Sequence, residues 1–238
     1  MELTELKDRI IDTFSGSNED LEKVLAFVEE NEIFPFNQYE NLICNLIGKG
    51  WLTYEQYLDI RTEYIRKNPN LHLFEISAPR GFGEKFAQTY VQSKCPKLKK
   101  PSKMLDPSYA GEYDLWLDGI TIEVKASRAV DSDSEKPLYM KALSRDTNKR
   151  FIMNFQQLKP HCCDVFIWVA IFRDEKVLWV INSNEVLNHP LFSKGQHRGN
   201  KGNEGQFHIK HDNIEQLNQF ILKGNNFEQV IQDAAKRK

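Results

Sequence analysis

The stretch YDLWLDGITIEVKAS, residues 113–127, joins two apolar runs through the dipeptide Asp118-Gly119. An Asp-Gly pair between apolar segments is typical of a two-residue β-hairpin, because a type I′ turn needs positive φ at both central positions. A turn this short also fixes which residues lie opposite each other in the two strands. The stretch therefore predicts a hairpin of defined register, and the rest of the fold is built outward from it.

The predicted register brings three charged side chains together. Asp114 is expected to face Glu123, with Cβ atoms ~4.5–5.5 Å apart. Because side chains alternate between the faces of a strand, Lys125 lies on the same face as Glu123. The remaining alternate residues point to the opposite face and anchor the hairpin in the core: Leu115, Leu117, Ile122 and Val124.

Two carboxylates at this distance repel each other unless a cation lies between them. Mg²⁺ is bound in proteins by one or two carboxylates together with waters and phosphate oxygens. A neighbouring lysine can stabilise charge on a phosphate or help to deprotonate an attacking water. These residue types indicate a metal-dependent centre for phosphodiester hydrolysis. The alternative is a surface hairpin with a charged, solvated face, but Trp116 and the flanking apolar residues favour a hairpin that is covered on both faces.

This arrangement resembles the PD-(D/E)xK nuclease superfamily, which includes the type II restriction endonucleases. The family motif is an aspartate on one strand followed by Glu-x-Lys on the adjacent strand. Asp114 and the segment Glu123-Val124-Lys125 stand at those positions, and Tyr113 stands where the family has proline. The resemblance covers residues 80–182, roughly the middle of the chain.

The resemblance implies an α/β (α+β) fold, with a restriction-endonuclease-like mixed β-sheet core flanked by helices. It also implies Mg²⁺-dependent cleavage of DNA, with Asp114 and Glu123 as metal ligands and Lys125 as the residue that orients or activates water. Mn²⁺ is expected to substitute for Mg²⁺.

Two further catalytic residues are implied by the same resemblance. Glu84, in a helix before the hairpin, matches an auxiliary acid, and Gln156 or its neighbour Gln157, in a predicted helix after it, matches a glutamine near the site. The plain alternatives are an acid favoured by a helix N-terminus for Glu84 and an exposed amide for Gln156.

The chain divides into a helical N-terminal subdomain, residues 1–70, and a nuclease core with C-terminal helices, residues 71–238. Apolar periodicity and capping patterns predict four helices in the subdomain, at 3–14, 17–31, 37–50 and 53–68. In the core, the same signals predict helices at 81–94, 147–160, 213–222 and 226–237, buried strands at 164–172 and 176–182, and a Gly-rich basic loop at 193–206.

Charge is unevenly distributed along the chain. Residues 1–60 contain 13 acidic and 4 basic residues, which gives this segment a net charge of −9. Because the whole chain has a net charge of −2, residues 61–238 have a net charge of +7. Lysines of the run at 93–103 are predicted to contact DNA phosphates, and the loop at 193–206 mixes phosphate-binding and base-reading side chains. The alternative is that both are solvated surface loops. The predicted DNA-binding residues are Lys97, Lys99, Lys100, Lys103, Gln196, His197, Arg198, Asn200 and Lys201.

The expected partners are double-stranded DNA and a second copy of the chain, because a homodimer matches the symmetry of a palindromic target. The N-terminal subdomain could embrace DNA through Arg61, Arg66 and Lys67, or act as a dimerisation arm, which its negative charge favours. The chain has no GxxxxGK(S/T) motif, so no nucleotide cofactor is expected. It has no apolar run near the ~20 residues of a membrane span and starts without a signal-peptide pattern, which predicts a cytoplasmic protein without a membrane partner.

Three functions remain open at this stage. The leading hypothesis is a type II restriction endonuclease that hydrolyses double-stranded DNA at a specific short sequence. The second is a repair or nicking nuclease of the same superfamily. The third is a non-catalytic DNA-binding protein that retains the fold, and the intact set of Asp114, Glu123 and Lys125 argues against it.

Overall fold

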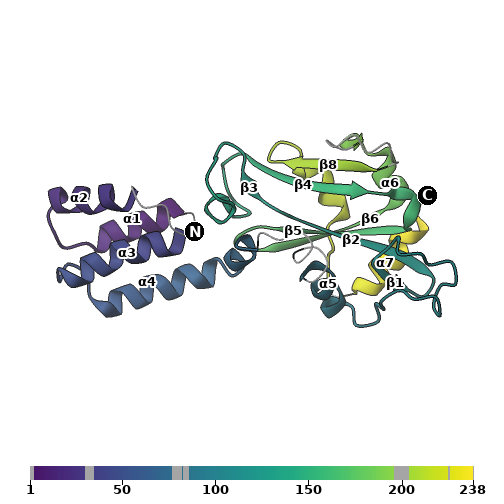
Figure 1. Ribbon diagram of the computed structural model, residues 1–238, viewed down its shortest axis with the longest axis horizontal. Coiled ribbons are helices and arrows are strands. Elements are labelled where there is room, and N and C mark those ends of the chain that lie inside the picture. The colour runs from purple at the N-terminus through teal and green to yellow at the C-terminus, as the bar shows by residue number, and fades with distance from the viewer. Residues whose placement is uncertain are drawn as a thin grey trace.

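Two four-stranded β-sheets form the centre of the protein, with a group of four helices at one end (Figure 1). The computed structural model describes residues 3–29, 35–76, 82, 86–195, 204–224 and 226–237. Within these ranges, no helix is both long enough and apolar enough to cross a membrane.

The four N-terminal helices are confirmed. They are α1 (Leu3–Thr13), α2 (Asn18–Glu29), α3 (Pro35–Gly48) and α4 (Tyr54–Lys67). The predicted capping box before α4 is also confirmed, since the Thr53 hydroxyl accepts the Gln56 N–H and the Gln56 side chain accepts the Thr53 N–H. A short 3₁₀ helix, η1 (Leu71–Phe74), follows α4.

The first sheet contains the hairpin and is mixed. Its strands are β1 (Leu115–Leu117), β2 (Ile120–Arg128), β5 (Val165–Ile171) and β6 (Lys176–Asn182), in the order β1-β2-β5-β6. Strand β2 pairs antiparallel with β1 and parallel with β5. The predicted register is confirmed at Leu115–Ile122 and Leu117–Ile120, and the two turn residues have φ angles of 47° and 94°.

The second sheet was not predicted. It is antiparallel, in the order β3-β4-β8-β7, with strands β3 (Val130–Asp131), β4 (Phe151–Leu158), β8 (Gly205–Lys210) and β7 (Phe192–Lys194). The helix predicted at 147–160 is therefore wrong, because this segment forms β4. Its apolar residues are spaced in a way that suits either a helix or a strand, and the segment becomes a strand because its backbone pairs with β8, about fifty positions later in the sequence.

Helices complete the structure. Helix α5 (Gln88–Lys94) precedes the hairpin, α6 (Ser183–Asn188) follows β6, and α7 (Phe227–Lys236) confirms the predicted C-terminal helix. The helix predicted at 213–222 is a 3₁₀ helix, η5 (Ile214–Phe220). Two shorter 3₁₀ helices are η3 (Leu138–Lys141) and η4 (Pro160–Cys162).

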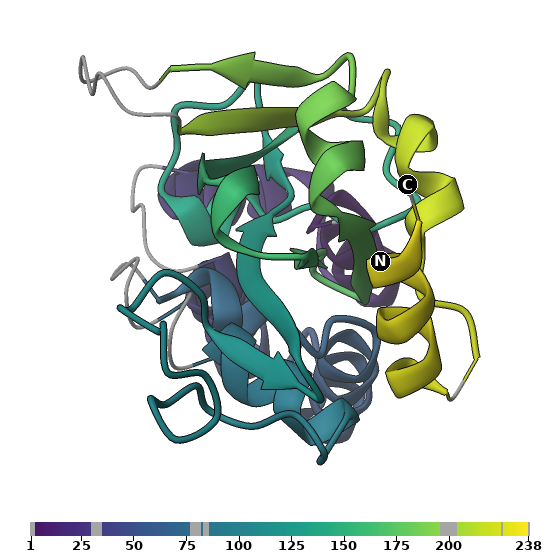
Figure 2. The same ribbon diagram turned by 90° about the vertical axis from the view of Figure 1, so that its right-hand side faces the viewer.

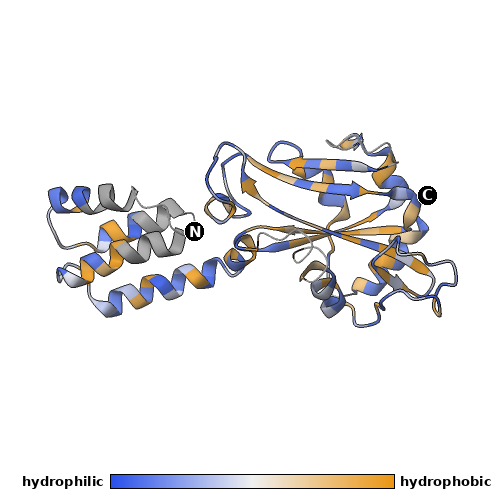
Figure 3. Ribbon diagram, viewed as in Figure 1, coloured by the Kyte–Doolittle hydropathy of each residue, from blue (hydrophilic) through white to orange (hydrophobic). Residues whose placement is uncertain are grey.

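Strand β5 separates two apolar clusters, which explains its uninterrupted apolar sequence (Figure 3). Val165, Ile167, Val169 and Ile171 belong to a cluster that continues into the N-terminal helices and α7. Phe166 and Trp168 belong to a cluster shared with the second sheet, where the rings of Trp168 and Phe155 stack with centroids 4.9 Å apart. Helix α7 lies on the side of the first sheet that faces away from β8 (Figure 2).

The observed mixed sheet with flanking helices agrees with the predicted α+β class. The restriction-endonuclease-like arrangement and the division at residue 70 stay predictions. One apolar cluster contains buried residues from both sides of that position, including Leu42 and Ile167.

We expect Gly119→Ala to destabilise the protein by about 1–2 kcal/mol, because alanine is strained at the φ of 94° that this turn requires. Gly48→Ala is the matched control, since Gly48 ends a helix without positive φ and a Cβ there would meet no atom within 4 Å. Urea unfolding of both variants measures the difference. Equal midpoints for the two variants would contradict the assigned turn.

Candidate active site

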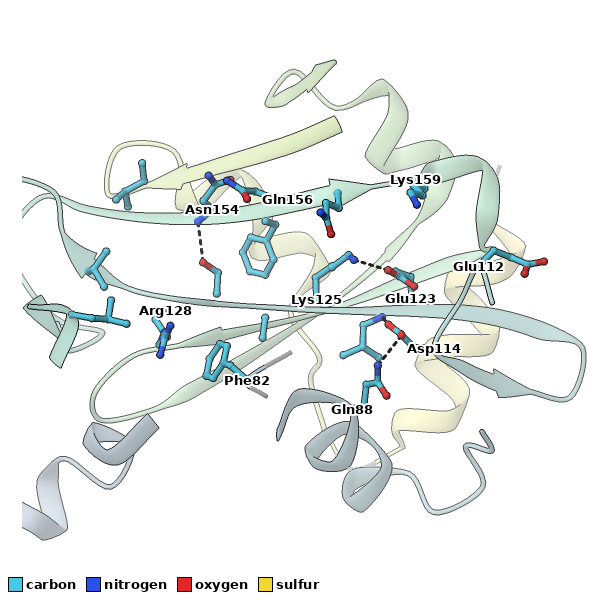
Figure 4. A pocket seen from close by; sticks show the side chains of 18 of the residues that line it. Phe82, Gln88, Glu112, Asp114, Glu123, Lys125, Arg128, Asn154, Gln156 and Lys159 are labelled. Carbon is cyan, nitrogen blue, oxygen red and sulfur yellow. Dashed lines mark hydrogen bonds and ion pairs between the residues drawn. The ribbon is translucent and has the colours of Figure 1, made fainter. Parts of the chain in front are cut away.

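A cleft of about 800 Å³ opens between β2 and β4, and the predicted catalytic residues Asp114, Glu123, Lys125 and Gln156 all line it (Figure 4). This volume is within the range of ligand-binding sites, ~300–1,000 Å³. The other polar residues along its wall are Gln88, Glu112, Ser127, Arg128, Asn154, Gln157 and Lys159.

Glu123 and Lys125 lie on the side of β2 that faces β4 (Figure 4). The Lys125 Nζ is 2.6 Å from the Glu123 Oε1, and their side chains are only 22% and 16% exposed. Between them, Val124 points to the opposite face and is buried in the core. Because side chains alternate along β2, Glu123 and Lys125 share one face and the buried Val124 between them anchors the strand in the core, as the sequence predicted.

Asp114 reaches the site in a different way from the one predicted. The paired ladder of β1 and β2 ends at Leu115–Ile122, so Asp114 does not form a strand pair with Glu123. Its backbone N–H donates to the Ile122 carbonyl at 2.9 Å, and its side chain replaces the next ladder acceptor, since Oδ2 accepts the Val124 N–H at 2.9 Å. Its Oδ1 accepts from Gln88 Nε2 at 2.7 Å.

The two carboxyl groups have unlike environments. The pKa of Glu123 is raised to about 7, mainly by burial and also by the neighbouring Asp114, while the Lys125 ammonium opposes the shift. Asp114, by contrast, accepts two hydrogen bonds, one from the Gln88 amide and one from the Val124 N–H. Near neutral pH Glu123 is therefore about half protonated when no metal is bound, and a divalent cation can take the place of its proton.

The residues fit a magnesium ion better than a zinc ion. The described part of the chain contains no group of three or more His, Cys, Asp or Glu side chains placed to hold a metal. Zn²⁺ normally takes three or four protein ligands, whereas Mg²⁺ keeps several waters and needs only one or two carboxylates. Asp114 and Glu123 supply such a pair in a water-accessible cleft.

Gln156 lies at the cleft, but on a strand and not on a helix as predicted. The pairing of β4 with β8 shifts between Phe155 and Leu158, and Gln157 has a φ of 55°. This β-bulge leaves both glutamines exposed, one after the other. A positive φ is uncommon for a residue other than glycine, and bulges often re-aim side chains beside functional sites.

The predicted DNA-binding lysines differ in their surroundings. Lys97 forms an ion pair with Glu228 at 2.9 Å, and the Lys100 ammonium donates to the Gln88 Oε1. Lys99 is exposed, with its ammonium 5.7 Å from the centre of the Trp116 ring, and Lys103 is exposed. Glu84 and the loop residues Gln196, His197, Arg198, Asn200 and Lys201 lie outside the described residues.

The sequence interpretation missed Gln88, Glu112, Asn154 and Lys159. Gln88 could have been found, because it stands four positions after Glu84 on the same face of the predicted helix. Asn154 and Lys159 could not, since the segment that carries them was predicted as a helix. Lys159 pairs with Glu204 at 3.2 Å at the rim of the cleft.

No protein-family model matches this chain, and a search of curated proteins gives no significant match. The function therefore has to be argued from the chemistry of the site.

We expect Glu123→Gln to stabilise the metal-free protein increasingly as pH rises from about 4.5 to 7. The raised pKa means that the folded state holds the Glu123 proton more tightly than the unfolded state. The stability that this proton contributes is complete below about pH 4.5 and is lost as pH rises through about 7. Glutamine stays neutral and avoids that loss.

Melting temperatures in EDTA across this pH range measure the effect. Glu215→Gln, which changes an exposed glutamate of η5, is the control. A constant difference between Glu123→Gln and the wild type at every pH would contradict the raised pKa.

Proposed function

We propose that this chain is a Mg²⁺-dependent type II restriction endonuclease that hydrolyses phosphodiester bonds of double-stranded DNA at a specific short sequence. The observation that carries the proposal is the meeting of Asp114, Glu123 and Lys125 in one cleft. Glu123 and Lys125 lie on β2 and Asp114 directly precedes β1, and the apolar face of this hairpin holds them in place.

Asp114 and Glu123 would hold the ion. Bound Mg²⁺ supplies a positive charge that polarises the phosphate and lowers the pKa of an attached water. The Asp114 carboxylate is held by two donors and keeps free lone pairs for a ligand. Glu123 would hold the ion as a carboxylate, and the charge of the cation would offset the cost of burying that carboxylate.

Lys125 is suited to the phosphate and the attacking water. Its ammonium donates hydrogen bonds and accepts none, so it can orient a water lone pair or stabilise charge on a phosphate oxygen. The ion pair with Glu123 fixes its position in a partly buried site, where a charge is worth more than in bulk water.

Features around the cleft support DNA as the substrate. The exposed Lys99 and Lys103 belong to the basic run just before the hairpin and are available for phosphate contacts. At the bulge, Gln156 and Gln157 expose amides that can both donate to and accept from base edges.

The homodimer is part of the same proposal. Tyr54, Leu58 and Ile65 are 57%, 40% and 46% exposed and lie along one face of α4. The same helix carries Glu55 and Asp59 in its first half and Arg66 and Lys67 at its end. Antiparallel packing of α4 against its copy would therefore bury the apolar face and bring opposite charges together.

We expect the purified protein to cut unmethylated plasmid or phage DNA into discrete fragments with Mg²⁺ or Mn²⁺ and to leave it intact in EDTA. Glu123→Gln and Lys125→Met should each lower the cleavage rate by at least about 100-fold while DNA binding remains, because they remove a metal ligand and a transition-state charge. Lys223→Met, at an exposed lysine before α7, is the control and should cut normally.

Other gel patterns would redirect the assignment. Nicked circles or a smear would favour a repair or nicking nuclease with the same centre. DNA binding without cleavage in either metal would favour a non-catalytic DNA-binding protein, and unimpaired cutting by Glu123→Gln would refute this active site.

We expect Leu58→Glu to shift the protein from dimer to monomer in sedimentation velocity at micromolar concentration, because it places a charge in the centre of the proposed interface. Met104→Glu is the matched control, since Met104 is 95% exposed and lies outside α4. A monomeric wild type, or a Leu58→Glu variant that remains dimeric, would contradict the proposed role of α4.

A further inference from the structure

A chain of three side chains leads from the surface to the candidate metal ligand Asp114. The Lys100 ammonium donates a hydrogen bond to Gln88 Oε1, and Gln88 Nε2 donates to Asp114 Oδ1 at 2.7 Å. Figure 4 shows Gln88 and Asp114 below β2, joined by this hydrogen bond. Gln88 is 7% exposed, so its amide is almost completely removed from water.

Each member of this chain is placed by a different element. Gln88 is the first residue of α5, and Asp114 directly precedes β1. Lys100 is positioned by its neighbour Lys99, whose backbone N–H and carbonyl both bond to Trp116 of β1 at 2.9 Å. The segment with Lys100 therefore lies against the hairpin and is not a free surface loop.

The chemistry of the three side chains decides which atom donates and which accepts in each hydrogen bond. A lysine ammonium can only donate hydrogen bonds, so it requires the oxygen of the Gln88 amide. The NH₂ group of Gln88 must then face Asp114, where an ionised carboxylate is the matching acceptor. With the amide reversed, NH₂ would face the ammonium and oxygen would face the carboxylate, and both contacts would be repulsive.

These hydrogen bonds fix the orientation of the Asp114 carboxylate. Gln88 holds Oδ1 and the Val124 N–H holds Oδ2, so rotation of the carboxylate breaks two hydrogen bonds. We propose that Gln88 is a positioning residue for Asp114 and that Lys100 acts through Gln88, in place of the phosphate contact predicted for it. This inference rests on the proposed function for its use of Asp114 as a metal ligand.

A double-mutant cycle tests the inference through equilibrium binding of Mn²⁺ to the DNA-free protein, followed by the EPR signal of free Mn²⁺. Gln88→Leu should weaken binding about tenfold, the loss of one hydrogen bond to a charged group. Lys100→Met should weaken it by a smaller factor, and the double variant should match Gln88→Leu. Lys100→Arg should restore binding, because arginine is also a donor without an acceptor.

Two controls give the scale of the measurement. Lys94→Met removes another exposed lysine at the end of α5 and should leave Mn²⁺ binding unchanged. Asp114→Asn sets the level at which the ligand itself is lost. Losses that add in the double variant would overturn the inference, because Lys100 would then act independently of Gln88. Wild-type binding by Gln88→Leu would overturn it as well.

A second measurement needs no metal. The side-chain NH₂ resonances of Gln88 in the ¹⁵N-labelled protein should move in both Lys100→Met and Asp114→Asn, and stay in place in Lys94→Met. Unmoved resonances in the first two variants would overturn the relay. If these resonances move as expected while neither the wild type nor Asp114→Asn binds Mn²⁺, the relay stands and the proposed nuclease function fails.

Discussion

The structure depends on one constraint, which is that strand β5 must be buried on both faces. Its seven residues are all buried, and each face belongs to a different apolar cluster. Helices cover one face and the second sheet covers the other, so the three layers follow from this strand. Strand β2 is bonded to β5 over seven residue pairs, so Ile122 and Val124 on one of its faces join the first cluster, while its other face lies at the margin of the second.

The position of β2 explains the electrostatics of the site. In the parallel register Glu123 lies beside Phe166 and Lys125 beside Trp168, and both aromatic residues belong to the cluster under the second sheet. The charged pair is thus at the edge of an apolar layer, where the sheets diverge and the cleft opens. Partial burial at this edge is the main cause of the raised pKa of Glu123, and the closeness of Asp114 adds to it.

The parts of the fold that local chemistry determines could be predicted from the sequence. The Asp118-Gly119 turn requires positive φ, which fixed the strand pairs and the faces of Glu123 and Lys125. The second sheet was not predicted, because β4 and β8 lie far apart in the chain, the apolar residues of β4 suit a helix as well, and the alternation in β8 spans only six residues. The bonds of Asp114 to Gln88 and to the Val124 N–H also escaped prediction, since they arise where the regular ladder stops.

The same burial that makes Glu123 costly to ionise is what makes the pair suitable for a cation. A carboxylate in water gains little when it binds a metal ion, because solvent already stabilises its charge. At the margin of an apolar layer that stabilisation is reduced, so the difference between the empty and the occupied site is larger. In the proposed metal site, Asp114, held by two donors, would be the fixed ligand, and Glu123, held by one lysine, would exchange its proton for the metal. Burial of these carboxyl groups lowers the folding stability of the metal-free protein, and a cation bound at the same position would raise it again.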